Sequence, residues 1–289
     1  MPTVSIGMPT YNCERYIAQS LESLLAQTYT DFELVISDNA STDGTEDVCR
    51  KYAQLDSRIR YIRRTENIGG PGNFRYVFSQ CSGKYHKWST ADDYWDTTFV
   101  AKSVAVLDAD PGVVLCYPKT RLIDVSGNKL ADYDDNLDLR DESPRVRFFE
   151  LLDRIGLCNA HLGMIRRSAM LQTSLITAEH ASDVYFLAVL ALYGKFALLP
   201  EQLFFRRFHE QSSSWDRKNL EHQKKYYDPT GKTARGMHTW RKYRHLMGGA
   251  WGAPIGIGEK LGITRRLSRT FLWERRQLAT ELAALARSR

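Results

Sequence analysis

Two adjacent carboxylates, Asp92 and Asp93, follow a short β-prone run that ends near Ser89. Neighbouring carboxylates repel each other unless a cation or a positively charged ligand compensates their charge. Mg²⁺ and Mn²⁺ prefer carboxylate oxygens and bind phosphate oxygens in their other coordination positions. The pair therefore suits a site at which a metal ion neutralises a departing pyrophosphate. Taken alone, it also fits a solvated turn or a helix cap.

Three further polar residues stand next to predicted elements. Asp38 closes a second β-prone run, and a carboxylate there could accept an N–H from a nucleobase edge or form an Asx-turn. His209 follows a run of aromatic and basic residues, where it could bind a metal, contact a phosphate or serve a structural role. Asp183 precedes an apolar helical run that it could simply cap.

These residues lie between elements that alternate between strand and helix. Apolar and β-branched runs predict strands at residues 4–9, 32–37, 59–62, 85–89 and 113–117. Apolar residues at spacings of three and four predict helices at 14–27, 45–52 and 73–80, the last opened by a glycine-rich loop. The alternation indicates βαβ units and a mainly parallel sheet, which binds ligands beyond the carboxyl ends of its strands.

Composition is that of an ordinary globular chain of 289 residues, with 43% hydrophobic and 26% charged residues. We recognise no secretory signal and no apolar stretch of about 18 residues that would span a membrane. The five cysteines lack metal-ligand spacing, which predicts reduced thiols and a cytoplasmic location.

The charge is unevenly distributed along the chain. Residues 217–289 contain 17 Lys and Arg but only 5 Asp and Glu. We therefore expect a domain at 1–215 and a basic, mostly helical C-terminal extension at 216–289, with glycine breaks before a final amphipathic helix at 266–287. The extension would either touch an anionic membrane surface, as a peripheral contact at its inner face, or pack on the body or a second subunit. It lacks a nucleic-acid motif, so we expect no nucleic-acid partner.

The order and spacing of several motifs together resemble family-2 glycosyltransferases of the GT-A fold, over residues 3–215. The motifs are Pro9-Thr10-Tyr11-Asn12, Gln27-Thr28-Tyr29, Asp38 before Ser41-Thr42-Asp43-Gly44-Thr45, Asn67-Ile68-Gly69, Gly83-Lys84-Tyr85 and Asp92-Asp93. The resemblance implies an α/β fold with a Rossmann-like, mainly parallel central sheet flanked by helices.

On the nucleotide side, the resemblance implies that Pro9, Thr10 and Tyr11 line the base and ribose pocket. It implies that Asp38 hydrogen-bonds the base and that the loop from Asn67 to Asn73 borders the nucleotide. A carboxylate suits the ring N–H of uracil, thymine or guanine, whereas cytosine and adenine lack that group. A UDP- or dTDP-sugar donor is therefore favoured, and a GDP-sugar is the third option.

On the metal side, the resemblance places Asp92 near the ribose or the metal shell and Asp93 on a Mn²⁺ or Mg²⁺ ion. The first position of the longer family motif, usually Asp, is Thr90 here. The family's Arg-x-His ending corresponds to Arg207 and His209, which implies contact of Arg207 with the pyrophosphate and of His209 with the metal.

The resemblance also implies a general base, for which Asp183 is the candidate and Glu179 the fallback. The implied reaction is inverting transfer of a sugar from a nucleotide-sugar to a hydroxyl of a glycan or lipid-linked acceptor, in glycan, polysaccharide or glycoconjugate biosynthesis. One alternative is a nucleotidyltransferase, although Thr10-Tyr11-Asn12-Cys13 is not the glycine-rich, basic loop of those enzymes. The other is a non-catalytic nucleotide-sugar binding protein.

Overall fold

The structure, a computed structural model, describes residues 1–210, 226–227 and 237–287. Its strands are β1 (Val4–Thr10), β2 (Phe32–Asp38), β3 (Ile59–Arg63), β4 (Tyr85–Trp88), β5 (Tyr94–Trp95), β6 (Val113–Ile123), β7 (Lys129–Tyr133), β8 (Met164–Arg166) and β9 (Lys195–Arg207). Its helices are α1 (Ile17–Leu25), α2 (Thr45–Leu55), α3 (Gly70–Ser79), α4 (Phe99–Ala109), α5 (Pro144–Arg154), the 3₁₀ turn η1 (Asn159–Leu162), α6 (Arg167–Met170), α7 (Ser182–Leu190), α9 (His238–Gly252), α10 (Ile257–Trp273) and α11 (Arg275–Arg287).

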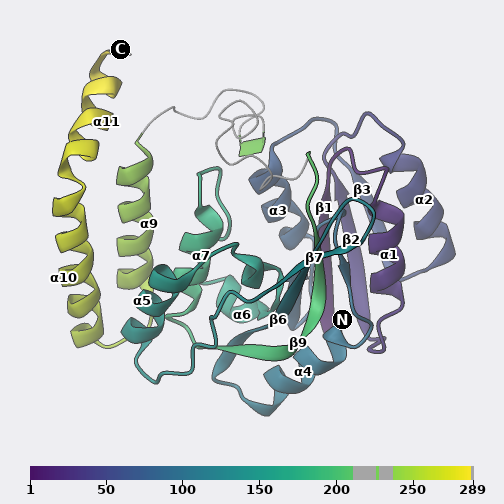
Figure 1. Ribbon diagram of the computed structural model, residues 1–289, viewed down its shortest axis with the longest axis horizontal. Helices are drawn as coiled ribbons and strands as arrows, with labels where there is room; N and C mark the ends of the chain where they lie inside the picture. The colour runs from purple at the N-terminus through teal and green to yellow at the C-terminus, as the bar shows by residue number, and fades with distance from the viewer. Residues whose placement is uncertain (211–225, 228–236, 288–289) are drawn as a thin grey trace.

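The strands form one nine-stranded sheet in the order β3-β2-β1-β4-β8-β6-β9-β5, with β7 paired to β6. In the N-terminal half, β1 runs parallel to β2 and β4, and β2 runs parallel to β3. Strands buried on both faces are expected to be continuously apolar, and β1 and β2 are almost entirely buried. Helices α1 and α2 lie on one side of these strands and α3 on the other (Figure 1). The predicted helix-flanked α/β sheet is confirmed.

The second half of the sheet contains four strands that the sequence pattern did not predict, β5, β7, β8 and β9. Strand β6 pairs in parallel with β9 and antiparallel with β7 and β8, and β5 pairs antiparallel with β9. Strands β5 and β8 have only two and three residues, which is too short for a periodic signal. The pairing of β5 stacks Trp95 on Phe204 with ring centroids 4.2 Å apart, so the Asp92–Asp93 turn is held against the end of β9.

The basic extension packs on the body. Helix α9 contacts α7, and α10 contacts α5. Leu246 of α9 and Ile263 of α10 belong to the same hydrophobic cluster as the sheet. The boundary at residues 215 and 216 lies outside the described residues and stays a prediction. No helix in the described part of the chain is both long enough and apolar enough to cross a membrane.

Several helix limits differ from the prediction: α1 is shorter at both ends, and α2 continues to Leu55. Helix α3 begins at Gly70, inside the expected loop, because Pro71 occupies the first turn, where its missing N–H is not needed. The expected helix at 266–287 is instead α10 followed by α11, and α10 runs through Gly262. A side chain at Gly262 would collide with Arg145 of α5, so this glycine allows close packing and is not a helix break.

His86 of β4 is fully buried, and neither ring nitrogen has a hydrogen-bond partner among the described residues. Burial lowers the pKa of His86 to about 3, with Arg167 and Lys87 adding to the effect. The unfolded chain takes up a proton at this residue below its ordinary pKa, whereas the folded chain does not. The free energy of unfolding should therefore fall as the pH drops below about 6.5.

We expect His86→Leu to reduce this acid sensitivity. Denaturant unfolding of both proteins between pH 7 and pH 5 should show a steeper loss of stability in the wild type, approaching about 1.4 kcal/mol per pH unit more than in the variant. The other histidines are common to both proteins, so the difference isolates His86. Parallel pH profiles would contradict the assignment.

Candidate active site

Asp38 lies at the carboxyl end of β2, and its side chain is completely buried. Its Oδ1 accepts a hydrogen bond from the backbone N–H of Ser41 (2.9 Å), and its Oδ2 accepts one from the hydroxyl of Tyr61 (2.6 Å). Burial is the largest cause that raises the pKa of Tyr61, and the hydrogen bond to Asp38 raises it further. In this arrangement Asp38 holds the loop that follows β2, and its contact with a nucleobase stays a prediction.

Thr10 and Asn73 belong to the same buried polar network. The side-chain amide of Asn73 donates to the backbone carbonyl of Ser37 (2.7 Å) and accepts from the Ser37 hydroxyl (2.5 Å). The Thr10 hydroxyl donates to the same carbonyl at 3.3 Å. Buried polar groups need such partners, and here they join the first turn of α3 to the ends of β1 and β2. Both residues thus hold these elements together, and their predicted nucleotide contacts stay a prediction.

Tyr11 is the member of the predicted nucleotide pocket whose side chain is most open to solvent, with 47% of its surface exposed. Pro9 at the end of β1 is half-buried. Asn67 accepts hydrogen bonds from the side-chain amide of Asn39 (2.8 Å) and from the backbone N–H of Gly69 (2.8 Å). Asn67 and Asn39 therefore hold the loop before α3. Sequence analysis did not select Asn39, although its place directly after a strand-ending Asp38 is a signal that could have identified it.

Asp92 and His209 come together at the ends of β4 and β9. The Oδ2 atom of Asp92 lies 2.9 Å from the Nε2 atom of His209. The His209 ring also lies over Tyr16, with ring centroids 5.0 Å apart. Sequence analysis placed these two residues in the metal shell separately, and the fold brings a carboxylate oxygen and an imidazole nitrogen to one point.

Asp93 is buried behind this pair. Its Oδ1 accepts the backbone N–H of Arg207 (2.7 Å), and its Oδ2 accepts the hydroxyl of Thr90 (2.5 Å). Burial, with the neighbouring charge of Asp92, raises the pKa of Asp93 to about 7. Thr90, which replaces the first acid of the longer family motif, thus supports Asp93 through a hydrogen bond.

Arg207 is also buried, and its guanidinium is occupied by protein acceptors. It donates to the side chain of Gln19 (2.6 Å) and to the backbone carbonyls of Asp92, Asp124 and Val125 (3.1 Å each). These bonds join the turn that contains Asp92 to α1 and to the residues that follow β6. The predicted contact of Arg207 with pyrophosphate is untested, and the observed contacts make it a positioning residue.

A cavity of about 740 Å³ opens next to His209. Asn12, Arg15, Tyr16 and Val125 line it together with His209. Asn12 adopts a left-handed backbone conformation (φ 51°), which turns the chain after β1 toward this space. Arg15 was not predicted as a site residue, although a basic residue close behind the Pro9–Asn12 motif is a recognisable signal for an anionic ligand.

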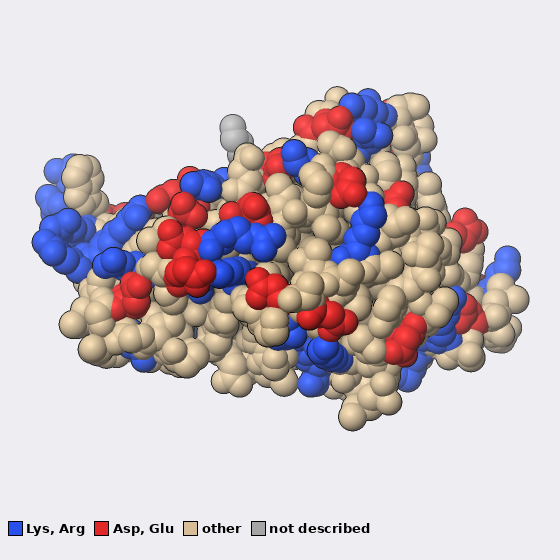
Figure 2. Space-filling view, turned by 90° about the horizontal axis from the view of Figure 1, so that it is seen from below, with Lys and Arg blue, Asp and Glu red and all other residues tan. Residues whose placement is uncertain are grey.

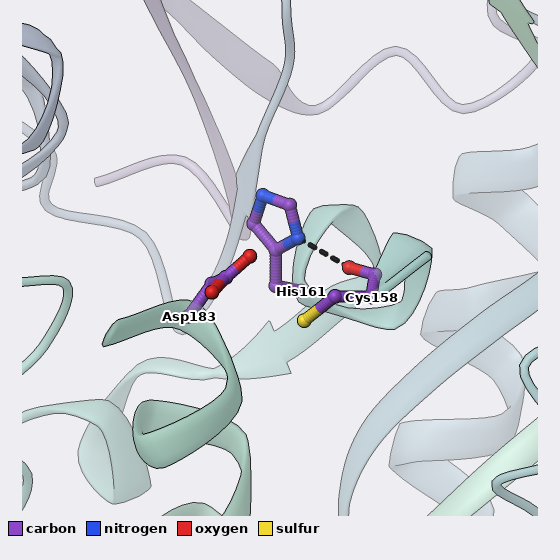
Figure 3. Close-up of side chains that lie close together, drawn as sticks. All are labelled: Cys158, His161 and Asp183. Carbon is purple, nitrogen blue, oxygen red and sulfur yellow. Dashed lines mark hydrogen bonds between the residues drawn. The ribbon is translucent and has the colours of Figure 1, made fainter. Parts of the chain in front are cut away.

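Asp183 lies in the first turn of α7, beside η1. Figure 3 shows its carboxylate converging with the His161 ring and the Cys158 thiol, and ligand-type atoms of the three lie within 4.8 Å of one another. The Nδ1 atom of His161 lies 2.5 Å from the backbone carbonyl of Cys158, which fits an Nδ1–H donor and a free Nε2 lone pair. Burial lowers the pKa of His161, so the ring is neutral beside Asp183. Neither His161 nor Cys158 was predicted.

Glu179, the fallback base, is directed away from this cluster. Its carboxylate lies 2.6 Å from Nε2 of His245 and within 4.0 Å of Arg241 and Arg244, all on α9. Glu179 therefore anchors the C-terminal extension to the body. These contacts disfavour Glu179 as the general base. Asp183, next to the His161 ring, stays the candidate.

Tyr226 lies next to the start of α3. Its ring lies against Gly70 at the start of α3, where even a Cβ atom would come within 2.5 Å of it. Burial raises the pKa of Tyr226, and the charges of Tyr227, Asp183 and Asp92 raise it further. The charges of the Asp183 and Asp92 carboxylates thus both act on the Tyr226 phenol.

The fold is that of GT-A glycosyltransferases. The chain is similar to Staphylococcus aureus TarS 1-349 in complex with UDP, with a TM-score of 0.64 and 17% identity, covering 90% of this chain and 69% of that chain. It is also similar to the mannosyltransferase PcManGT from Pyrobaculum calidifontis in complex with GDP-Man and Mn²⁺, with a TM-score of 0.56 and 18% identity, covering 99% and 80% of the two chains. Similarity at this identity shows the fold, and it confirms the predicted GT-A architecture.

Residues 5–171 match the family described as Glycosyl transferase family 2. The match spans more than half of the chain, and the protein therefore belongs to this family. Bacillus subtilis EpsE, a putative glycosyltransferase, is 37% identical over 108 residues, which are 37% of this chain and 39% of EpsE. Escherichia coli WfaP, a UDP-Glc:α-D-GlcNAc-diphosphoundecaprenol β-1,3-glucosyltransferase, is 34% identical over 110 residues, which are 38% of this chain and 43% of WfaP. The matches thus span less than half of these relatives' length.

Proposed function

We propose that the protein is a metal-dependent, inverting glycosyltransferase that moves a sugar from a UDP- or dTDP-sugar to an acceptor hydroxyl. One observation carries this proposal: Asp92 and His209 meet 2.9 Å apart beyond the carboxyl end of β4. The charges of Asp92 and of Asp183, the candidate base, both raise the pKa of the Tyr226 phenol. A site for the departing nucleoside diphosphate and a base for the acceptor would then face the same bound sugar. Neither a nucleotidyltransferase nor a binding protein needs that second carboxylate.

The chemistry of the side chains supports a divalent cation at this site. Asp92 and His209 would hold the ion, with Asp93 as a third ligand after it leaves Thr90. Burial, and then the charge of Asp92, raises the pKa of Asp93, and a cation would neutralise the charge of this pair. When bound, Mn²⁺ or Mg²⁺ would stabilise negative charge on the pyrophosphate. Arg207 would keep the Asp92–Asp93 turn in position for this role.

Asp183 would act as the general base. Its carboxylate would accept the proton of the acceptor hydroxyl as that oxygen attacks the anomeric carbon, while the bond from this carbon to the nucleoside diphosphate breaks. Attack from the face opposite the leaving group inverts the anomeric configuration in one displacement. The neutral His161 ring beside Asp183 would leave its carboxylate charge available, because an imidazolium would bind that charge.

The acceptor is proposed to be a glycan or a lipid-linked saccharide. WfaP, by its name, glucosylates a diphosphoundecaprenol-linked sugar, and Bacillus subtilis TuaG is named a putative teichuronic acid biosynthesis glycosyltransferase. The segment 131–161, which we expect to form the acceptor side, contributes Cys158 and His161 next to the proposed base. All five cysteines are free thiols, which supports a cytoplasmic location.

A screen of nucleotide-sugars tests the proposal without knowledge of the acceptor. Thermal unfolding should be measured with each nucleoside diphosphate and nucleotide-sugar, with and without Mn²⁺. We expect uridine or thymidine diphosphates to raise Tm more than adenosine or cytidine diphosphates, and more with the metal present. Slow release of the nucleoside diphosphate from one donor should accompany binding. Binding with no release from any donor would favour a non-catalytic binding protein.

We expect Asp38→Ala to weaken nucleotide binding even without metal, by about tenfold. The substitution leaves the Tyr61 hydroxyl and the Ser41 N–H without their acceptor, which should also cost about 1–3 kcal/mol of stability for each. Isothermal titration with UDP in the presence of a chelator would give the affinity, and denaturant unfolding would give the stability.

Tyr61→Phe separates the two effects, because it removes the same hydrogen bond from the other side and keeps the carboxylate. If Asp38 contacts the base, Tyr61→Phe should destabilise the fold while UDP affinity changes less than twofold. Equal loss of affinity in both variants would mean that Asp38 acts only by holding the loop.

A further inference from the structure

Helices α10 and α11 follow one another along the outer edge of the molecule, beyond α9 (Figure 1). Their inner side is formed by Ile263, Leu267 and Leu278, which are buried.

Every acidic residue of these two helices is directed inward. Glu259 pairs with Arg145 of α5 (3.2 Å), and Glu274 pairs with Lys242 of α9 (2.7 Å). Glu281 accepts the backbone N–H of Thr239 (3.0 Å) in the first turn of α9. The acidic groups thus serve internal contacts, and none of them neutralises the outer side of α10 and α11.

The arginines have the opposite distribution. Arg265, Arg269, Arg275 and Arg276 are exposed, and none forms an ion pair with a residue in the described ranges. Arg266 alone is paired, with Asp153 of α5 (2.7 Å). Figure 2 shows Lys and Arg gathered at this end of the molecule. The outer side therefore carries a net positive charge, and these four arginines have no ion-pair partner among the described residues.

Large apolar side chains are interspersed with these arginines. Leu261, Leu272 and Trp273 expose 55%, 60% and 87% of their surface. At about 100° per residue, Leu261, Arg265, Arg269, Leu272 and Arg276 lie within about 60° of the direction opposite Ile263 and Leu267. Trp273 lies about 20° beyond this arc. We call these six residues the outer face.

We propose that the outer face binds the surface of an anionic lipid bilayer. Exposed Leu and Trp side chains would enter the boundary between head groups and acyl chains, and the arginines would bind the lipid phosphates. Arg265 and Arg269 also line a groove of about 530 Å³ next to α5, where the acids Glu150 and Asp153 face the basic side chains. A bilayer matches both components of the face, whereas nucleic acid would leave the leucines without a partner.

A second copy of the chain fits the face less well. In a two-fold symmetric contact the same patch meets itself, which would set these arginines against each other without any acid from the patch to compensate them. Membrane contact extends the proposed function, because it would bring the enzyme to a lipid-linked acceptor, but its physical basis does not depend on the acceptor.

Vesicle co-sedimentation tests the proposal with the full chain. We expect binding to vesicles of phosphatidylglycerol and phosphatidylcholine, weak binding to pure phosphatidylcholine, and loss of binding at high salt. Arg269→Gln with Arg276→Gln should weaken binding about 25-fold, at about fivefold for each charge. Leu272→Ser with Trp273→Ser should weaken it about tenfold or more. These side chains are exposed, so Tm should change little.

Lys51→Gln with Leu55→Ser provides a matched control, because it removes one exposed cation and one exposed leucine from α2 at the other end of the molecule. The control should bind vesicles like the wild type, and all variants should keep Mn²⁺-dependent UDP binding in solution. No binding of the wild type to anionic vesicles would overturn the proposal, as would equal loss in the control. A dimer in sedimentation that only the outer-face variants lose would identify a subunit interface and also overturn it.

Discussion

Asp183→Asn should lower sugar transfer by about 10²–10⁴-fold while UDP affinity stays within twofold of the wild type. The amide keeps the shape of the side chain but cannot accept the hydroxyl proton. Asp183 is only half-buried, and its carboxylate accepts the N–H of Val184 (2.9 Å), which an amide oxygen also accepts. The fold should therefore tolerate the change. Turnover with the donor found in the screen, and titration with UDP and Mn²⁺, give the two quantities.

Asp47→Asn is the matched control, because it makes the same chemical change in the first turn of α2 at an exposed position. It should keep full activity. If Asp183→Asn kept more than about a third of wild-type turnover, Asp183 would not be the base. Loss of activity together with loss of UDP binding would instead assign Asp183 to the nucleotide pocket.

Asp92→Asn should remove most of the metal-dependent part of nucleotide binding. We expect UDP affinity in Mn²⁺ to fall by about 100-fold, and affinity in the presence of a chelator to stay nearly constant. The physical reason is that the Asp92 carboxylate, 2.9 Å from His209, is the negatively charged ligand on the open side of the buried Asp93. His209→Asn should cause a smaller loss of about tenfold. Isothermal titration with and without Mn²⁺ gives both numbers.

Asp108→Asn, at a half-exposed position on α4, serves as the control and should bind UDP like the wild type in both conditions. An unchanged response of Asp92→Asn to Mn²⁺ would show that the ion binds elsewhere. An equal loss with and without Mn²⁺ would mean that Asp92 contacts the nucleotide directly and not through a cation.

The parallel half of the fold could be predicted because its signals are local. Strands β1 and β2 are β-prone runs rich in buried apolar residues, and each ends at a predicted site residue, Thr10 or Asp38. What the pattern could not give is whether these side chains face a ligand or the protein interior. Asp38 and Asn73 are buried. They accept hydrogen bonds from Tyr61 and Ser37, which belong to other elements of the fold.

The antiparallel half and much of the site depend on contacts between distant parts of the chain. Strand β9 returns beside β6 and brings His209 to Asp92, 117 residues earlier. Such a pairing gives no periodic pattern in the sequence. Only the resemblance to a family predicted that His209 and Asp92 belong to one site. His161 and Cys158 were not predicted as site residues. The turn at Cys158 has a left-handed backbone, but the glycine or asparagine that usually indicates such a turn is absent at this position.

The configuration of the released sugar tests the central assignment most directly. The wild-type enzyme should be incubated with Mn²⁺ and an α-linked UDP-sugar that it binds, with water as the acceptor, and the sugar should be observed by NMR before it mutarotates. We predict that the β-anomer appears first, together with UDP, and that chelation of the metal or Asp183→Asn stops its formation. Initial release of the α-anomer, or release that continues at an unchanged rate in the Asp183→Asn variant, would contradict single-displacement transfer from this site.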